Sequence, residues 1–69
     1  MQLCWTDIEE IAEALEETYP DADIMTLRFT TLRKWVTELE DFYDDPNRCN
    51  EKILEAIQGA WVRLRDEEL

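Results

Sequence analysis

The chain of 69 residues contains no histidine, one glycine, two prolines and two cysteines. Without histidine, and without a glycine-rich phosphate loop, the sequence lacks the groups that most acid–base, nucleophilic and phosphoryl-transfer sites require. We therefore expect a protein that is not an enzyme and that acts by binding. The scarcity of glycine and proline leaves little material for tight turns, so the composition favours helices over β-hairpins.

The two cysteines, Cys4 and Cys49, are too few and too distant in sequence for a disulfide framework or a C-x-x-C motif. A structural zinc site needs about four sulfur or nitrogen ligands, and this chain offers two thiols and no imidazole. We interpret both cysteines as reduced thiols without a special role. The alternative of a disulfide between them stays open at this point.

Basic residues are also scarce: seven Lys and Arg stand against 18 Asp and Glu, which gives a formal net charge of -11. Such a surface repels nucleic acid and anionic membranes, because binding to phosphates depends on Lys and Arg. Cations and basic protein surfaces are the expected partners. The sequence shows no basic leader followed by an apolar run and no apolar stretch of membrane-spanning length, so we expect a cytoplasmic protein.

Apolar residues are plentiful: they make up 45% of the chain and include three Trp, two Tyr and two Phe. This content is enough to build a core, and the length predicts a single domain over residues 1–69. We expect a mainly α fold, namely a small three-helix bundle with a short extra helix. Its topology is expected to be winged-helix-like or helix-turn-helix-like, and the protein is expected to be a monomer.

Two of the expected helices follow from apolar spacings of three and four residues together with capping residues. The first helix is expected to begin after Thr6, interpreted as an N-cap that forms a capping box with Glu9. It is expected to end near residue 18, because Pro20 disfavours helical geometry in the residue before it. The second helix is expected over residues 31–42, with Thr30 as its N-cap.

The remaining elements are a short turn and a last helix. Asp23 is a plausible N-cap for a turn over residues 24–28, and Asn50 is a plausible N-cap for the last helix. That helix is expected to reach about residue 65. We expect residues 62–69 to include a frayed C-terminal tail.

Negative charge is concentrated near the start of the chain. Residues 1–27 hold eight Asp and Glu and no Lys or Arg, whereas the other 42 hold ten acidic and seven basic residues. On the first expected helix the face opposite the apolar stripe carries Glu9, Glu13, Glu16 and Glu17. Like charges at i,i+4, such as Glu9 with Glu13, each cost roughly a few tenths of a kcal/mol. A solvated face and a binding face both fit this pattern.

A second acidic cluster lies between residues 38 and 45, at the end of the second expected helix, where carboxylates oppose the helix macrodipole. All-oxygen clusters suit hard divalent ions such as Fe2+, Mn2+, Ca2+ or Mg2+, held loosely and with little selectivity. The candidate metal ligands are Glu10, Glu13, Glu17, Asp41, Asp44 and Asp45. The candidate partner-binding residues are Asp7, Glu9, Glu10, Glu13, Glu17, Glu38 and Asp41.

Three motifs, in order along the chain, resemble the IscX family of iron–sulfur cluster assembly proteins. They are Trp5-Thr6-Asp7, then Tyr19-Pro20-Asp21-Ala22-Asp23 with Leu27-Arg28-Phe29-Thr30, and finally Leu39-Glu40-Asp41-Phe42 followed by Asp44-Asp45-Pro46. The segment from Asn50 to Ile57, with Trp61 after it, is similar to the last helix of that family. The resemblance covers residues 3 to 61 without gaps.

The resemblance implies an iron-binding adaptor or regulator of cluster assembly. Such a protein binds ferrous iron and the cysteine desulfurase IscS through an acidic surface, where the scaffold protein and bacterial frataxin also compete. An alternative is an iron donor to the assembly complex. A helix-turn-helix DNA-binding protein is a further alternative, but Arg28, Arg33 and Lys34 are too small a basic cluster against a net charge of -11.

Overall fold

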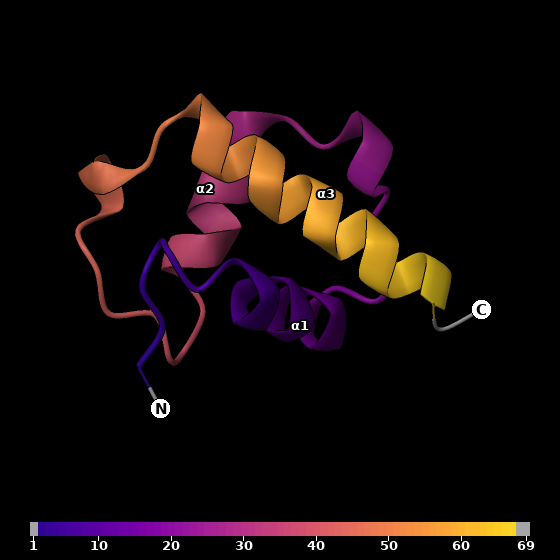
Figure 1. Cartoon of the computed structure of the whole chain (residues 1–69), viewed down its shortest axis with the longest axis horizontal. Coiled ribbons are helices and arrows are strands. Elements are labelled where there is room, and N and C mark those ends of the chain that lie inside the picture. Colours follow the sequence, from indigo (N-terminus) through magenta and orange to yellow (C-terminus); the bar gives the residue numbers. More distant parts are fainter. Residues whose placement is uncertain (1, 68–69) are drawn as a thin grey trace.

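The computed structural model describes residues 2–67, which form three α-helices and two short 3₁₀-helices. Helix α1 spans Ile8–Thr18, α2 spans Phe29–Thr37 and α3 spans Glu51–Glu67, while η1 covers Ile24–Thr26 and η2 covers Pro46–Arg48. Figure 1 shows α3 running across the molecule, with α1 below it in this view. The mainly α, three-helix architecture expected from the sequence is confirmed. In residues 2–67 no helix is both long and apolar enough to span a bilayer.

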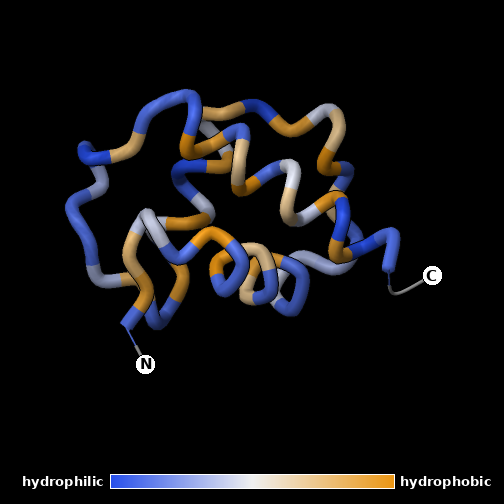
Figure 2. Tube along the Cα trace, viewed as in Figure 1, coloured by the Kyte–Doolittle hydropathy of each residue, from blue (hydrophilic) through white to orange (hydrophobic). Residues whose placement is uncertain are grey.

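The three helices turn their apolar faces towards one core, as the hydrophobic segments in Figure 2 show. The most extensive helix–helix contact joins α1 to α3, so the first and last helices of the chain form the main packing unit. Burial of large apolar side chains is the main favourable contribution to the stability of such a small domain. The fully buried side chains of the helices are Ile11, Leu15, Leu32, Val36, Ile57 and Trp61.

The segment before α1 is fixed to the loop after α2. Leu3 and Phe42 form an isolated parallel β-bridge. The Leu3 N–H donates to the Asp41 carbonyl oxygen at 2.7 Å, and the Tyr43 N–H donates to the Leu3 carbonyl oxygen at 2.9 Å. Because residues 3 and 42 are far apart in sequence, this bridge holds the acidic loop beside the N-terminal end of α1.

Aromatic rings reinforce this arrangement at two places. Trp5 is buried and packs edge-on against Phe42, with ring centroids 4.8 Å apart. Tyr19, just after α1, stacks on Trp35 of α2 with centroids 4.0 Å apart, and Trp35 in turn meets Trp61 of α3 edge-on at 6.4 Å. These aromatic contacts therefore add to the packing of α2 on α3 and fix the segments before and after α1 to the rest of the fold.

The expected capping box at the start of the first helix is wrong. The N-cap residue is Asp7, and no side chain caps the helix. The Asp7 carboxylate instead accepts a hydrogen bond from the Cys4 N–H at 2.9 Å, and the Asp7 N–H donates to the Cys4 carbonyl oxygen at 2.9 Å. A tight turn before the helix thus uses the side chain that would otherwise cap it, and Thr6 is exposed within that turn.

The expected bounds and cap of the second helix are also wrong. Helix α2 begins at Phe29 with Arg28 at the N-cap position, so Thr30 lies inside the helix. It ends at Thr37, five residues earlier than expected, and the chain turns so that Leu39 and Phe42 still reach the core. The spacing of Leu39 and Phe42 is compatible with a helix, but in the structure Leu39 lies in a turn and Phe42 lies in the β-bridge.

The last helix agrees with its expected start. The Asn50 side chain accepts a hydrogen bond from the Ile53 N–H at 2.9 Å, so Asn50 is the N-cap that the sequence indicated. The helix continues to Glu67, so the part of the expected tail within residues 62–67 is helical, and residues 68 and 69 lie outside the described part. Cys4 and Cys49 are free and half-buried.

Candidate acidic binding surface

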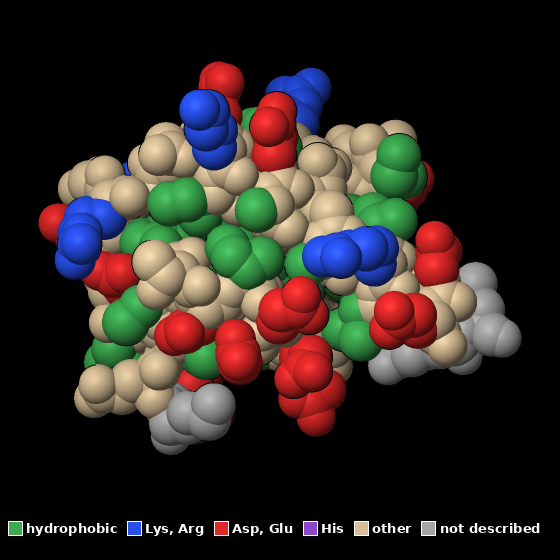
Figure 3. All heavy atoms as spheres, viewed as in Figure 1, with side chains coloured by type: hydrophobic (Ala, Val, Ile, Leu, Met, Phe, Trp, Pro, Cys, Tyr) green, Lys and Arg blue, Asp and Glu red, His purple; other side chains and the backbone are tan. Residues whose placement is uncertain are grey.

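The solvent-facing side of α1 carries the exposed carboxylates of Glu9, Glu10, Glu13 and Glu17. Burial of the opposite side against α3 fixes their direction, and Figure 3 shows acidic side chains gathered in the lower part of the view, where α1 lies. Glu9 has a long, exposed ion pair with Arg63 at 3.8 Å. Within residues 2–67 the carboxylates of Glu10, Glu13 and Glu17 pair with no basic residue. We call these three residues the acidic face.

Glu16 does not belong to the solvent-facing set in which its helical position placed it. Its Oε1 atom accepts a hydrogen bond from Trp61 Nε1 at 2.9 Å and pairs with Arg65 Nη2 at 2.7 Å. Arg65 also donates to the carbonyl oxygens of Tyr19 and Ala22, and its guanidinium lies over the Trp61 ring at 5.5 Å from the centroid. Glu16 and Arg65 therefore join α1, α3 and the connecting loop.

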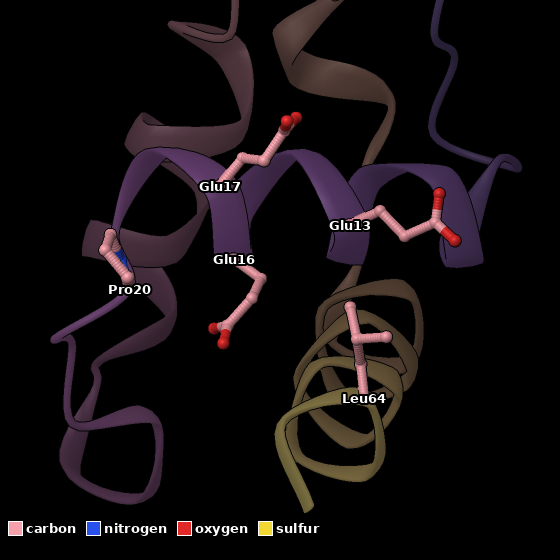
Figure 4. Close-up of a pocket in the computed structure, with 5 residues that line it drawn as sticks. All are labelled: Glu13, Glu16, Glu17, Pro20 and Leu64. Carbon is pink, nitrogen blue, oxygen red and sulfur yellow. The ribbon is translucent and has the colours of Figure 1, made fainter. Parts of the chain in front are cut away.

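A shallow hollow of about 560 Å³ lies beside the acidic face, lined by Glu13, Glu16, Glu17, Pro20 and Leu64. Figure 4 shows that the three carboxylates do not converge: Glu16 points towards α3, whereas Glu13 and Glu17 point away from it in different directions. The hollow thus presents dispersed negative charge around a small apolar floor. This arrangement suits a basic side chain of a partner better than a tightly coordinated ion.

The structure brings the two acidic clusters together at one point. A groove of about 170 Å³ has Glu17 from α1 on one side and Glu40 and Asp41 from the loop after α2 on the other. Leu3, Ala14 and Leu39 form its apolar part. Glu40 was not among the candidate ligands or contact residues, although its place in the acidic run of residues 38–45 was an available signal.

Asp44 has a structural role in the second cluster. Its Oδ2 accepts a hydrogen bond from the Trp5 N–H at 3.1 Å, and its Oδ1 accepts one from the Asp45 N–H at 2.7 Å and pairs with Arg48 at 3.4 Å. The backbone hydrogen bond from Trp5, then that from Asp45, and also the charge of Arg48, lower the pKa of Asp44 below its usual value of 3.8. Its side chain is only 12% exposed.

The remaining candidate residues are placed apart from the acidic face. Asp45 caps η2 by accepting a hydrogen bond from the Asn47 N–H at 2.9 Å, and its carbonyl oxygen accepts one from Trp5 Nε1 at 2.7 Å. Asp7 is half-buried in the turn before α1, and Glu38 is exposed at the C-terminal end of α2. The structure thus separates the second cluster into an exposed part, which includes Asp41, and a part held by the loop.

The candidate metal ligands form no preorganised cage. Within residues 2–67, no group of three or more Asp, Glu, Cys or His side chains lies close enough together to hold one ion. A high-affinity cation site needs several oxygen ligands at about 2.0–2.6 Å around one point. The donors present here are of the right chemistry for a hard cation, but their geometry does not fit a resident metal.

The fold and this surface define a small acidic helical protein with a negatively charged face of exposed carboxylates on α1. The family model described as iron–sulphur cluster assembly matches residues 3–66, and the chain belongs to that family. The resemblance seen in the sequence motifs is thereby confirmed. An uncharacterized protein of Pseudomonas aeruginosa is 53% identical over 66 residues, which are 96% of this chain and 100% of that protein.

Proposed function

We propose that the chain is a non-catalytic adaptor of iron–sulfur cluster assembly that binds the cysteine desulfurase IscS through the acidic face. The chain's membership of the iron–sulphur cluster assembly family supports a role in that process. The observation that carries the binding role is the lack of any basic partner for Glu10, Glu13 and Glu17 within residues 2–67. Carboxylates that crowd one helix without counter-charges cost stability, and a basic surface on a partner removes that cost.

We propose that the interface with the desulfurase also includes the groove between α1 and the loop after α2. Glu40 and Asp41 lie across the groove from Glu17, so a partner that contacts α1 also meets the loop. The apolar part of the groove accommodates the aliphatic stem of a Lys or Arg whose charged end reaches these carboxylates. The scaffold protein and bacterial frataxin, if they use the same basic surface of the desulfurase, are competitors.

We also propose that iron regulates the interaction with the desulfurase. Fe2+ is attracted by the accumulated charge of the acidic face and of Asp41, with Asp44 and Asp45 contributing to the local potential. Because no cage is preformed, the ion is held weakly and exchanges readily. Binding of the ion partly neutralises the face that meets the desulfurase, and this couples iron level to complex formation.

The first prediction tests the acidic face with a charge-matched pair of variants. The double substitution Glu13→Lys and Glu17→Lys reverses an i,i+4 pair on α1, and Glu51→Lys with Glu55→Lys reverses an exposed i,i+4 pair on α3. We expect the α1 variant to lose at least about tenfold in affinity for the purified desulfurase, measured by calorimetry with and without Fe2+. The α3 variant is expected to change affinity by about threefold or less.

Equal losses in both variants would show that net charge, and not the acidic face, determines binding. Circular dichroism checks that both variants stay helical. The wild-type complex is also expected to weaken as ionic strength rises to about 0.15 M, where the Debye length is about 8 Å. An affinity that does not depend on salt would contradict an electrostatic interface.

A further inference from the structure

A second, oppositely charged site lies on α2, away from the acidic face. A pocket of about 230 Å³ is lined by Thr30, Arg33, Lys34 and Thr37 of α2 and by Pro46 of η2. Its lining holds two cations and no carboxylate, in a chain with 18 acidic and seven basic residues. We propose that this pocket binds a compact oxyanion, namely a phosphate group.

The Arg33 side chain is held in place before any ligand arrives. Its Nε donates to the Pro46 carbonyl oxygen at 3.0 Å, and its Nη2 donates to the Asn47 Oδ1 atom at 3.0 Å. These two bonds use two of the five guanidinium N–H groups, so three remain for an anion. The contact with η2 fixes the guanidinium, which reduces the entropy that a ligand has to overcome.

Other donors beside Arg33 are also free. The Lys34 ammonium has no ion pair within residues 2–67, although Glu38, the C-cap residue of α2, follows it at i+4. The Thr30 hydroxyl likewise has no hydrogen bond to any described residue. Three of the seven basic residues, Arg48, Arg63 and Arg65, do pair with carboxylates. Two neighbouring cations without a counter-ion repel each other, and a bound anion relieves this repulsion.

The chemistry of these donors selects the class of ligand. One guanidinium matches a planar carboxylate, whereas donors from Arg33, Lys34 and Thr30 match an anion whose oxygens point in several directions. The pocket is small compared with typical cavities for drug-sized ligands of about 300–1,000 Å³, so it admits a single phosphate group. Nucleic acid is disfavoured, because a polyanion also meets the surrounding charge of -11.

The test is a ¹⁵N NMR titration of the full chain with inorganic phosphate, with sodium chloride at matched ionic strength as the reference. We expect saturable shifts confined to the amides of residues 30–37, 47 and 48, with a dissociation constant in the millimolar range. The double variant Arg33→Gln with Lys34→Gln is expected to lose about tenfold in affinity. The control Arg28→Gln with Lys52→Gln removes two exposed cations that do not line the pocket, and it is expected to change affinity by about twofold or less.

The variant Asn47→Ala tests whether the fixed position of the Arg33 guanidinium, and not positive charge alone, determines phosphate affinity. It leaves the net charge unchanged but removes one of the two hydrogen bonds that hold the Arg33 guanidinium, so we expect about a threefold loss of phosphate affinity. A phosphate monoester such as glycerol 3-phosphate competes for the same amides if the pocket takes a phosphate carried by a small molecule, whereas selective binding of inorganic phosphate assigns the free anion. Identical shifts with chloride, equal losses in the two double variants, or tighter binding of a DNA oligonucleotide than of phosphate would each overturn the proposal.

Discussion

At the scale of single residues, Asp44 shows how a carboxylate in an acidic chain becomes a structural group. It accepts hydrogen bonds from the backbone of Trp5 and Asp45 and pairs with Arg48, so it ties the N-terminal segment to the loop after α2. These contacts favour the ionised form in the folded state and lower the pKa of Asp44 below 3.8.

A pH dependence of stability follows from this lowered pKa. The stabilisation is present above the ordinary value of about 3.8 and is lost as the pH falls through the lower, folded-state pKa. We expect Asp44→Asn to reduce the free energy of unfolding at pH 7, and the gap to the wild type to narrow below about pH 3.8. Urea denaturation of the wild type and the variant, from pH 7 to below about pH 3.8, measures the loss at pH 7 and the change of the gap with pH. Asp21→Asn, at an exposed site, is the control, and a gap that stays constant with pH would contradict the role of Asp44.

Arg65 offers a second prediction for a single residue. Arg65→Ala leaves Glu16, whose side chain is only 16% exposed, without its 2.7 Å partner and removes donors to two carbonyl oxygens. We expect a loss of about 1–3 kcal/mol in the free energy of unfolding, measured by urea denaturation. Arg63→Ala breaks only the exposed 3.8 Å pair with Glu9 and is expected to cost less than about 1 kcal/mol. Equal effects would show that the Glu16–Arg65 contact contributes no more than a surface pair.

At the scale of elements, α1 combines a well-packed face with a face of unfavourable charges. Glu13→Lys places a positive charge between Glu9 and Glu17, at i+4 from one and i−4 from the other. We expect this substitution to raise the free energy of unfolding by about 0.5 kcal/mol, because it replaces two repulsions by two attractions. Thermal denaturation measures the change. A loss of stability would mean that the Glu13 carboxylate makes a favourable contribution within the fold.

The sequence predicted some elements better than others, and the reasons are physical. The apolar spacings of α1 and α3 and the cap at Asn50 were sufficient because these helices pack through continuous stripes. For α2 the same criterion failed, since Leu39 and Phe42 keep a helical spacing while lying in turns and in a bridge to Leu3. That bridge depends on a contact between distant segments, which local periodicity does not record.

The candidate surface was predictable to a similar extent. The exposed positions of Glu10, Glu13 and Glu17 follow from the helical period of α1. The engagement of Glu16 by Arg65 and Trp61 does not, because it depends on where the last turns of α3 cross α1. The groove that places Glu40 and Asp41 opposite Glu17 was also not predictable from the helical period, since its two sides come from separate elements.

At the scale of the whole molecule, charge dominates the expected behaviour towards metal ions. We expect Fe2+ to bind with a dissociation constant nearer micromolar than nanomolar, and Ca2+ or Mn2+ to compete, because dispersed carboxylates select poorly. Paramagnetic broadening of amide signals by Mn2+ or Fe2+ locates the ion, with broadening expected around the acidic face and Asp41. Neutralising Glu10, Glu13 and Glu17 to Gln is expected to weaken binding several-fold. Broadening centred on Cys4 or Cys49 would instead indicate thiolate ligation.

The pairing of α1 with α3 also has a consequence for biosynthesis. Helix α1 is synthesised before α3, and its most extensive helix–helix packing is with α3, which carries Ile57 and Trp61. Arg65 of α3 also contacts Glu16 and the loop between Tyr19 and Ala22. Until α3 has left the ribosome, the nascent chain therefore leaves the side of α1 that carries Ile11 and Leu15 incompletely covered and accessible to chaperones and proteases. Premature termination before α3 should yield a product that is cleared by proteolysis, and folding should take place as one late, cooperative event.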